Sequence, residues 1–422
     1  MEVFGLVVLA LLVAIGVPMW LSILAGSAIS LVLGYGMEPH MMFSIMYDKV
    51  NVTSLLAVPL FFLAGEALYH GGASRPLVQF FNKYMGHIPG GPAYAVILAC
   101  TVMAAMSSTA MAAVAGFGPI MVPMMEQMGY SRRFAIGLLV SASSLGVLIP
   151  PSIPLIIFGF VTETSVKDLY SAAFIPGALM VVLLALTVFI HTRRGHYSSP
   201  PPASWRERWD ALKTGLPVLM MPVAVLVPIY VGWVTATESA VVAAVYSILL
   251  GFIVYRELTV SKLWSACVRV AHLSSMLFAV LAVAFLLNLV LVYMKVPMDL
   301  GDALSSVGFN WMALLALMVL LYLVMGAFLD SSTILIVMSP ILLPAVVEQG
   351  ISPVLFGVLT VISVELAAIT PPYGITLFAA SGVLREKFSL VARACFMFYP
   401  ALIVGQLLIA FFHKIALWLP GL

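Results

Sequence analysis

Small hydroxyl residues and paired prolines interrupt the strongly apolar segments of this chain, and both residue types can supply oxygen ligands to a cation. Ser107-Ser108-Thr109 and Ser331-Ser332-Thr333 each divide one long apolar stretch, and Pro150-Pro151 and Pro371-Pro372 each divide another. Proline removes an N–H donor and clashes with the preceding helical turn, so a proline pair unwinds a helix. The carbonyls that are freed, together with the hydroxyls, form a ligand set for a hard cation such as sodium.

These interruptions occur in two copies of one sequence pattern. Three features recur in the second half of the chain at the same offset: the pair Pro119 and Pro123 as Pro340 and Pro344, Gly129 as Gly350, and Pro150-Pro151 as Pro371-Pro372. The two Ser-Ser-Thr triplets have a slightly larger offset, which predicts a small insertion or deletion between each triplet and its prolines. Duplicated halves with broken apolar segments at matching positions are typical of secondary transporters.

The repeat predicts two symmetric cation sites, each formed where a hairpin tip meets a broken helix. The first site is predicted at Ser107, Gly146, Ile149 and Pro151, and the second at Gly326, Ala367, Thr370 and Tyr373. Two alternatives remain open. The hydroxyls could bond back to carbonyls of their own helix or hold neighbouring helices together, and the prolines could produce simple kinks.

A substrate site is predicted between the two hairpin tips. Helix N-termini at the tips carry partial positive charge and favour a carboxylate. No Arg or Lys falls at the tips or breaks, so an anion would be held by backbone groups and the cation. The predicted substrate-binding residues are Ser107, Ser108, Thr109, Asp330, Ser331, Ser332, Pro151 and Pro372.

Four carboxylates stand out within the apolar segments: Glu66, Glu238, Asp330 and Glu365. Ionisable residues inside a bilayer are costly and are functional candidates by default. Asp330 could instead cap the helix that follows it. For Glu66 and Glu238, which lie away from the repeated motifs, structural pairing is the alternative.

The composition predicts a membrane protein. Of 422 residues, 63% are hydrophobic and only 9% charged, whereas a soluble domain has about 25% charged residues. The three cysteines share no short spacing, which argues against a disulfide framework or a zinc site. The first residues lack a basic n-region, so no cleavable signal peptide is expected. No phosphate loop, zinc-ligand motif or nucleophile elbow is present, so neither an enzyme nor a nucleic-acid partner is expected.

The apolar segments predict an all-α polytopic membrane protein with ten transmembrane spans and two re-entrant helical hairpins. A span needs about 20 apolar residues, and the two longest stretches are read as hairpins. The predicted spans are 3–17, 18–36, 52–70, 134–164, 171–191, 215–232, 235–255, 272–294, 353–383 and 394–418; the hairpins are 92–128 and 309–348.

The distribution of basic residues predicts the orientation. If the hydrophilic linker 192–213 is cytoplasmic, 15 of the 19 Lys and Arg residues fall in cytoplasmic loops, as the positive-inside rule requires. The outside receives only Lys49, Lys167, Lys295 and Lys414. Each half then has three spans, a hairpin and two further spans, and the two halves are inverted with respect to each other.

The predicted organisation is therefore a first inverted repeat over 1–191, the cytoplasmic linker 192–213, and a second inverted repeat over 214–422. The first repeat contains the hairpin 92–128 and the broken helix 134–164. The second contains the hairpin 309–348 and the broken helix 353–383. Segment 256–271, with basic residues and a tryptophan among apolar ones, is predicted as an amphipathic helix on the cytoplasmic interface.

Several motifs resemble one family, the large membrane subunit of tripartite ATP-independent periplasmic (TRAP) transporters. These are Gly326-Ala-Phe-Leu-Asp330, Pro340-x-x-x-Pro344, Phe356-Gly357, Ile369-Thr-Pro-Pro372 and Leu145-Gly-x-Leu-Ile-Pro-Pro151. Thr235-Ala-Thr-Glu238-Ser-Ala resembles that family's Thr-Pro-Thr-Glu-Ala-Ala stretch. Two positions depart from the family pattern: Ala105-Met106-Ser107 stands where Ser-Gly-Ser is usual, and Ala367 stands where Gly is frequent.

The resemblance implies an elevator-type secondary transporter in the inner membrane of a bacterium or archaeon, with sodium (Na+) as the coupling ion. It implies a small organic acid as substrate and two protein partners, a small four-span membrane (Q) subunit and a periplasmic substrate-binding protein. Two alternatives stay open: a stand-alone carboxylate or anion carrier of related fold, and a passive channel.

Overall fold

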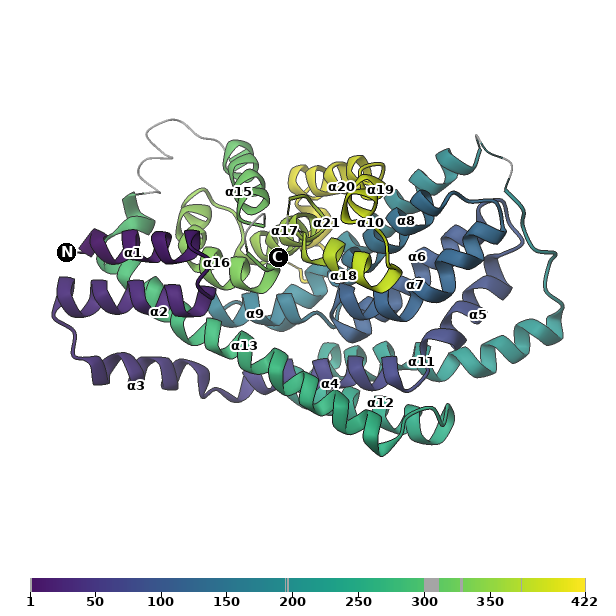
Figure 1. Cartoon of the computed structure of the whole chain (residues 1–422), viewed down its shortest axis with the longest axis horizontal. Helices are drawn as coiled ribbons and strands as arrows, with labels where there is room; N and C mark the ends of the chain where they lie inside the picture. The colour runs from purple at the N-terminus through teal and green to yellow at the C-terminus, as the bar shows by residue number, and fades with distance from the viewer. Residues whose placement is uncertain are drawn as a thin grey trace.

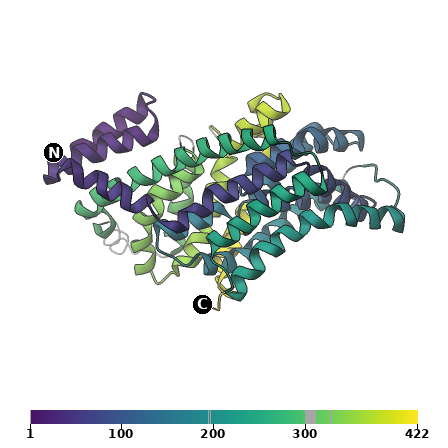
Figure 2. The ribbon, with the colours of Figure 1, turned by 90° about the horizontal axis from the view of Figure 1, so that it is seen from below.

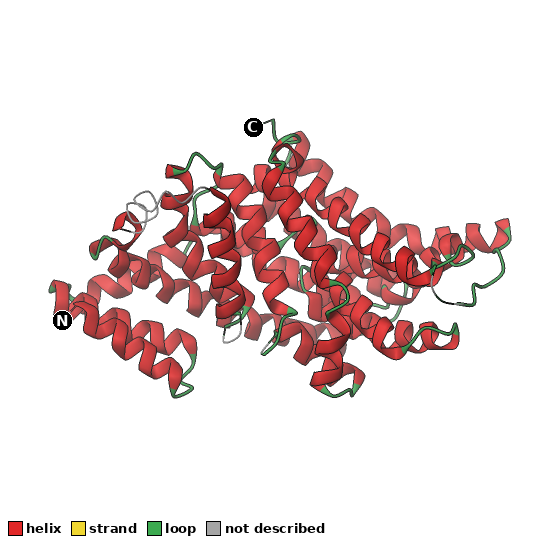
Figure 3. Cartoon of the chain, turned by 90° about the horizontal axis from the view of Figure 1, so that it is seen from above, coloured by secondary structure: helices red, strands yellow, loops and turns green. Residues whose placement is uncertain are grey.

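The computed structural model describes residues 2–193, 195, 197–299, 311–326, 329–372 and 374–421. All regular elements in these ranges are helices, and no strand occurs among them (Figure 3). In a bilayer the backbone must satisfy its own hydrogen bonds, which an α-helix does within one segment. The helices form an elongated molecule with α1 (Glu2–Ala14), α2 (Met19–Ile29) and α3 (Pro39–Val50) at one end (Figure 1).

In its described residues, the first half of the chain also contains two short irregular helical turns and seven further helices. A π-helical turn, η1 (Ser30–Gly34), follows α2, and a 3-10 turn, η2 (Thr53–Leu56), follows α3. The remaining helices are α4 (Ala57–His70), α5 (Ser74–Met85), α6 (Gly91–Ser107), α7 (Ala110–Gln127), α8 (Arg132–Gly146), α9 (Ile153–Val161) and α10 (Val166–Thr192).

The second half repeats the pattern of hairpins and broken helices. It contains α11 (Trp205–Val231), α12 (Ala236–Leu249), η3 (Leu250–Val254), α13 (Val260–Tyr293), α15 (Trp311–Met325), α16 (Ser331–Glu348), α17 (Pro353–Ala368), α18 (Ile375–Leu384), α19 (Phe388–Cys395), α20 (Tyr399–Phe411) and α21 (Lys414–Leu417). In the described part of the chain, six helices are long and apolar enough to cross a membrane, or seven if the bent pair α19 and α20 is one span.

The repeat keeps one constant register from the start of the second hairpin helix through the breaks. Helices α7 and α16 each have 18 residues, and their N-cap residues are Thr109 and Asp330. The predicted insertion or deletion is therefore wrong: Ser331 corresponds to Ala110 and not to Ser107. The triplets matched out of register because Ser and Thr are frequent at helix starts, where their hydroxyls cap N–H groups.

Three segments differ from the predicted elements. Residues 260–271 are not a separate interfacial helix but the first turns of α13, which runs unbroken for 34 residues. Residues 39–50, which lie between two predicted spans, form α3. Residues 205–213 of the predicted linker already belong to α11, whose N-terminus extends well before its apolar part. In each case polar residues lower the mean hydropathy without breaking the helix.

Helices α13, α4, α12 and α11 lie side by side and form one face of the molecule (Figure 2). Two contacts in this layer show why the helices approach closely. A side chain on Gly71 would collide with the backbone of Gly251, since a Cβ there would lie 2.9 Å from its Cα. Ser239 donates a hydrogen bond to the carbonyl of Val225 at 2.5 Å, which joins α12 to α11.

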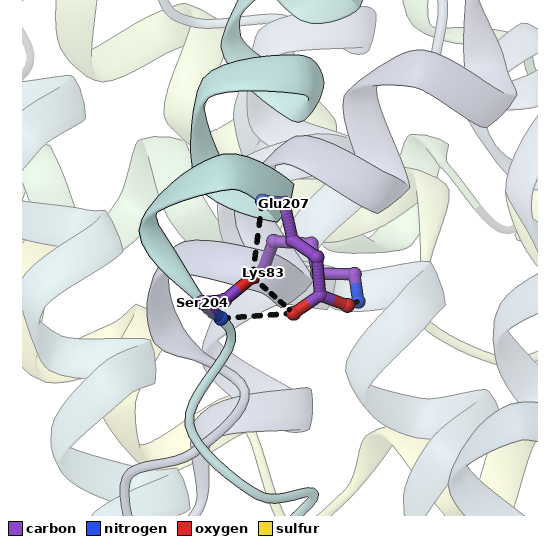
Figure 4. A network of polar contacts seen from close by, with 3 residues as sticks. All are labelled: Lys83, Ser204 and Glu207. Atoms are coloured by element: carbon purple, nitrogen blue, oxygen red, sulfur yellow. Dashed lines mark hydrogen bonds and ion pairs between the residues drawn. The ribbon is translucent and has the colours of Figure 1, made fainter.

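The linker is tied to the rest of the chain where α11 begins (Figure 4). Ser204 and Glu207 form a capping box, in which each side chain accepts the other residue's backbone N–H, at 3.3 and 2.8 Å. Lys83 Nζ lies 2.5 Å from Glu207 Oε1. The start of α11 is thereby held against α5.

One arginine joins the two halves at the base of the first hairpin. Arg132, the first residue of α8, lies 2.8 Å from Glu126 at the end of α7 and 2.6 Å from Glu386 beyond α18. The adjacent Arg133 donates to the carbonyl of Arg393 at 2.9 Å. The hairpin base, the first broken helix and the end of the second broken helix are thus held together.

Candidate functional site

The first hairpin turns at two residues. Ser108 adopts a left-handed conformation, with φ of 51°, between α6 and α7. Thr109 then caps α7 by accepting the N–H of Ala112 at 3.3 Å. Ser107 Oγ donates to the carbonyl of Thr109 at 3.2 Å. The hydroxyl groups at this tip therefore satisfy backbone groups that the turn leaves without helical partners.

The tip contacts the break between α8 and α9. Ser108 Oγ donates to the carbonyl of Pro151 at 3.0 Å. Behind the tip, α6 meets the end of α8 at Gly146, where a Cβ would lie 2.4 Å from Ala104 Cβ. The structure therefore brings Ser107, Ser108, Gly146 and Pro151 into one region.

The second half builds the same arrangement with different side chains. Asp330 caps α16: Oδ2 accepts the N–H of Thr333 at 3.1 Å, and Oδ1 accepts its hydroxyl at 2.5 Å. A Cβ on Gly326 would lie 2.5 Å from Ala367 Cβ. In the second half the glycine, Gly326, lies on the hairpin, whereas in the first half the glycine, Gly146, lies on the broken helix. Ala367 therefore fits because residue 326 has no side chain.

The same pattern of backbone hydrogen bonds occurs within each of the two breaks. In the first, Leu148 and Ile149 donate their N–H groups to the carbonyls of Leu145 and Gly146. In the second, the equivalent residues of the repeat do the same: Ile369 donates to Leu366, and Thr370 donates to Ala367. Both Pro-Pro bonds are cis. Thr370 Oγ1 also donates to the carbonyl of Leu366 at 2.6 Å. Tyr373, predicted at the second cation site, lies outside the described residues.

The broken helices meet at a pair of equivalent positions. Ser144 Oγ donates to Glu365 Oε2 at 2.9 Å and is 3.2 Å from the Glu365 carbonyl. The two residues are 221 positions apart, which is the offset of the repeated prolines, so each contacts its own counterpart in the repeat. A contact of this kind marks the pseudo-symmetry axis of the two halves. Both side chains are buried.

A cavity of about 200 Å³ lies between the two hairpin tips. Its polar walls come from the two hairpin tips and from the second broken helix, where Glu365 precedes the break and Thr376 follows it. Its apolar walls come from α13, from Phe62 on α4, and from hairpin and broken-helix residues such as Met111, Val147 and Ile336. The lining includes Ser108, Thr109, Val147, Ile153, Leu273, Met276, Leu277, Val280, Asp330, Ser331, Ser332, Thr333, Glu365, Ala368, Ile375 and Thr376.

Four helices begin at this cavity. The first residues of α7, α9, α16 and α18 are Ala110, Ile153, Ser331 and Ile375, and all four line it. A helix N-terminus carries about half a positive charge from its unpaired N–H groups. Among the described lining residues there is no Lys, Arg or His. The cavity therefore offers backbone dipoles in place of basic side chains.

The predicted substrate residues fall into two groups. Ser108, Thr109, Asp330, Ser331 and Ser332 line the cavity. Ser107 is buried behind the tip, Pro151 contributes its carbonyl to Ser108, and Pro372 is exposed. These last three are not among the cavity-lining residues.

Several lining residues were missing from the predicted site. Glu365 was noticed only as an ionisable residue in an apolar segment, and its correspondence with Ser144 was the signal that would have added it. The apolar wall on α13 carries no such signal. Its residues Leu273, Met276, Leu277 and Val280 follow helical spacing, as buried core residues do throughout the chain.

The remaining carboxylates have structural partners. Glu238 forms a capping box with Thr235, whose N–H lies 2.7 Å from Glu238 Oε2. Glu66 Oε2 lies 3.3 Å from both His70 Nε2 and Arg269 Nε. Structural pairing thus holds for both residues, and the capping role holds for Asp330.

We expect Ser144→Ala to lower the free energy of unfolding by about 1–3 kcal/mol, because it leaves the buried Glu365 carboxyl without its hydroxyl donor. Thermal unfolding of the purified variant in detergent measures this. Ser265→Ala is the matched control, since Ser265 is exposed and its hydroxyl donates to the Ser261 carbonyl of its own helix. Equal stability of the two variants would contradict the assigned contact.

Comparison with known families gives one match that spans nearly the whole chain. Residues 6–415 match the family described as "Tripartite ATP-independent periplasmic transporter, DctM component". The matched range includes both hairpins and both broken helices.

Two curated relatives illustrate the match. The C4-dicarboxylate TRAP transporter large permease protein DctM of Pseudomonas aeruginosa is 34% identical over 377 residues, which cover 89% of this chain and 88% of that protein. The isethionate TRAP transporter permease protein DctMQ of Oleidesulfovibrio alaskensis is 28% identical. The match covers 98% of this chain and 65% of that protein.

A solved structure shares the fold. The crystal structure of the Alcanivorax borkumensis YdaH transporter, described as having an unusual topology, superposes with a TM-score of 0.65. The superposition covers 96% of this chain and 98% of that one, at 16% sequence identity. At this identity the similarity supports the architecture alone.

Proposed function

The chain belongs to the TRAP transporter family as its DctM component, the large membrane permease, and from this premise we propose that it imports a small organic acid by sodium-coupled elevator transport. It is a multi-pass membrane protein and not an enzyme.

The convergence of four helix N-termini on one cavity carries the proposal of an anionic substrate. Partial positive charge there favours a carboxylate or a sulfonate. Asp330 offsets the partial charge of the α16 N-terminus, which it caps, so the partial charge that favours the substrate comes from α7, α9 and α18, whose N-caps Thr109, Ser152 and Gly374 are uncharged. A volume of about 200 Å³ lies below the roughly 300–1,000 Å³ of pockets for drug-sized ligands, so a small acid fits. C4-dicarboxylates, named for the Pseudomonas aeruginosa relative, are the first candidates.

The repeated breaks support the proposal of two sodium sites. Each break places carbonyls and hydroxyls beside a hairpin tip, through Gly146, Ile149 and Ser107 in the first half and Gly326, Ala367 and Thr370 in the second. Oxygen ligands from carbonyls and hydroxyls suit a hard cation. In the described part of the chain no cluster of three His, Cys, Asp or Glu residues is placed to hold a metal ion, so backbone oxygens are the principal ligands proposed.

The two walls of the cavity support an elevator movement. Hairpins and broken helices supply the polar lining residues, together with apolar ones such as Val147 and Ile153, whereas the lining residues of α13 are all apolar. Leu273, Met276, Leu277 and Val280 lie on one face of α13 at helical spacing. An apolar face has no hydrogen bonds to break when the polar part slides along it. We therefore assign α6–α9 and α15–α18 to the moving part and α4 and α11–α13 to the scaffold, within an inverted repeat of ten spans and two hairpins.

The proposed partners are a small four-span membrane subunit and a periplasmic substrate-binding protein, acting in the inner membrane. The family description supports both, since it names a tripartite, periplasmic system. The Oleidesulfovibrio alaskensis relative is called DctMQ, and this chain matches 65% of it. The remaining length has room for a small subunit fused to the permease.

The proposed sodium sites predict the behaviour of two variants. Ser107→Ala and Thr370→Val each remove one hydroxyl beside a break, so we expect about a tenfold rise in the sodium concentration that half-activates uptake, equivalent to about 1.4 kcal/mol. Uptake of radiolabelled succinate into proteoliposomes, titrated with sodium, measures this. Unchanged sodium activation in both variants would refute the sites. Ser265→Ala is the control.

A further inference from the structure

The scaffold wall of the cavity ends at an ion pair. Phe62 on α4 and Leu273 on α13 both line the cavity. One helical turn further along the same faces stand Glu66, four residues after Phe62, and Arg269, four residues before Leu273. Arg269 Nε lies 3.3 Å from Glu66 Oε2. The backbone of Arg269 therefore lies about 6 Å along the helix axis from that of Leu273, just beyond the cavity.

The pair is incompletely satisfied. The Glu66 side chain is 15% exposed and that of Arg269 is 55% exposed. The carboxylate also faces the His70 imidazole on the same helix, with Nε2 3.3 Å away. Neither the Glu66 Oε2 nor the His70 Nε2 atom makes a hydrogen bond within the described structure. The guanidinium has five donor N–H groups, so it has donors to spare for a second carboxylate.

The position of Arg269 along α13 indicates on which side of the membrane it lies relative to the cavity. It lies on the N-terminal side of the cavity, toward Lys262 and Arg256, which the positive-inside rule assigns to the cytoplasm. An inward movement of the polar wall by one helical turn along α13 would carry the cavity from Leu273 to Arg269. The substrate anion would then leave the helix N-termini beside a basic side chain.

We propose that Arg269 is a substrate contact at the cytoplasmic rim of the cavity, and that Glu66 holds its guanidinium in place until the departing carboxylate replaces Glu66 as its partner. This inference rests on the proposed function, because it needs an anionic substrate that travels inward. Exchange of one carboxylate for another leaves the guanidinium paired throughout, and the released Glu66 carboxylate keeps His70 Nε2 beside it at 3.3 Å.

Succinate uptake into proteoliposomes that contain this chain, the small subunit and the binding protein tests the inference. Wild-type sodium-driven uptake tests the proposed function, and the ratio of each variant to wild type tests Arg269. For Arg269→Gln we expect about a tenfold lower maximal rate, since the departing carboxylate loses a charge-assisted hydrogen bond. The external succinate and sodium concentrations for half-maximal uptake should be unchanged. Arg269→Lys should restore most of the rate.

A second set of variants separates substrate contact from helix packing. Glu66→Gln should keep uptake within about threefold of wild type, and Glu66→Gln/Arg269→Gln should be as slow as Arg269→Gln, with thermal unfolding in detergent like that of wild type. If the pair only held α4 against α13, the two single variants would be equally slow and the double variant would recover. Lys262→Gln, the same charge change on the same helix, is the control. A rate for Arg269→Gln within twofold of wild type would overturn the inference.

Discussion

Asp330→Ala is expected to lower sodium-driven uptake by about tenfold and the free energy of unfolding by about 1 kcal/mol, since loss of an N-cap costs about 0.5–2 kcal/mol. The variant removes both acceptors for Thr333, whose N–H is bound at 3.1 Å and whose hydroxyl is bound at 2.5 Å. The first turn of α16 forms one side of the cavity, so fraying there also displaces donors from the substrate. Uptake assays and thermal unfolding measure the two effects.

The chain itself provides the control for this prediction. Thr109 caps α7 at the equivalent position of the first half, without a charge. Asp330→Thr should therefore keep the cap and most of the uptake. If Asp330→Thr were as inactive as Asp330→Ala while remaining as stable as wild type, the carboxylate charge would be what transport needs, and the capping role would be insufficient.

Gly146→Ala is expected to lower uptake by at least about tenfold and stability by about 1–3 kcal/mol, the usual cost of overpacking. The added Cβ would lie 2.4 Å from Ala104 Cβ and 2.8 Å from the carbonyl oxygen of Thr101. To relieve these contacts, α6 must move away from the break, and the first proposed sodium site then loses its geometry. Sodium titration of uptake should show weaker activation as well as a lower maximal rate.

Two further variants make this prediction specific. Gly382→Ala adds the same methyl group to α18 with no atom within 4 Å, so it should leave uptake unchanged and slightly favour the helix. Ala104→Gly combined with Gly146→Ala copies the second half, where Gly326 on the hairpin faces Ala367 on the broken helix. This double variant should recover part of the activity. Wild-type sodium activation in Gly146→Ala would contradict the role of the contact.

The hairpins and breaks could be predicted from sequence because proline and glycine have strong local effects. Pro150-Pro151 and Pro371-Pro372 cannot continue a helix, and their constant offset revealed the repeat. The same comparison failed at the tips, where Ser and Thr are common and the two triplets matched out of register. The structural register is set by the caps Thr109 and Asp330, which are chemically different residues with the same hydrogen-bonding role.

The scaffold side of the cavity could not be predicted because its residues look like any other core residues. Leu273 and Met276 differ from other apolar residues of α13 only in what they face. Lys262 and Arg269 made the start of α13 look like a separate interfacial helix, although the helix is continuous. Charges at Asp48 and Lys49 similarly concealed α3. Hydropathy measures the preference of a single residue for lipid or water. Whether a charged residue can lie within a membrane helix also depends on its pairing with residues of other helices.

The most direct test of the account is succinate uptake into proteoliposomes that contain this chain and its small subunit. It is measured with and without an inward sodium gradient, and with and without the periplasmic binding protein. The account predicts uptake only when the gradient and the binding protein are both present. Uptake without the binding protein would indicate a stand-alone carrier, and uptake independent of sodium would contradict the proposed coupling ion and the two cation sites.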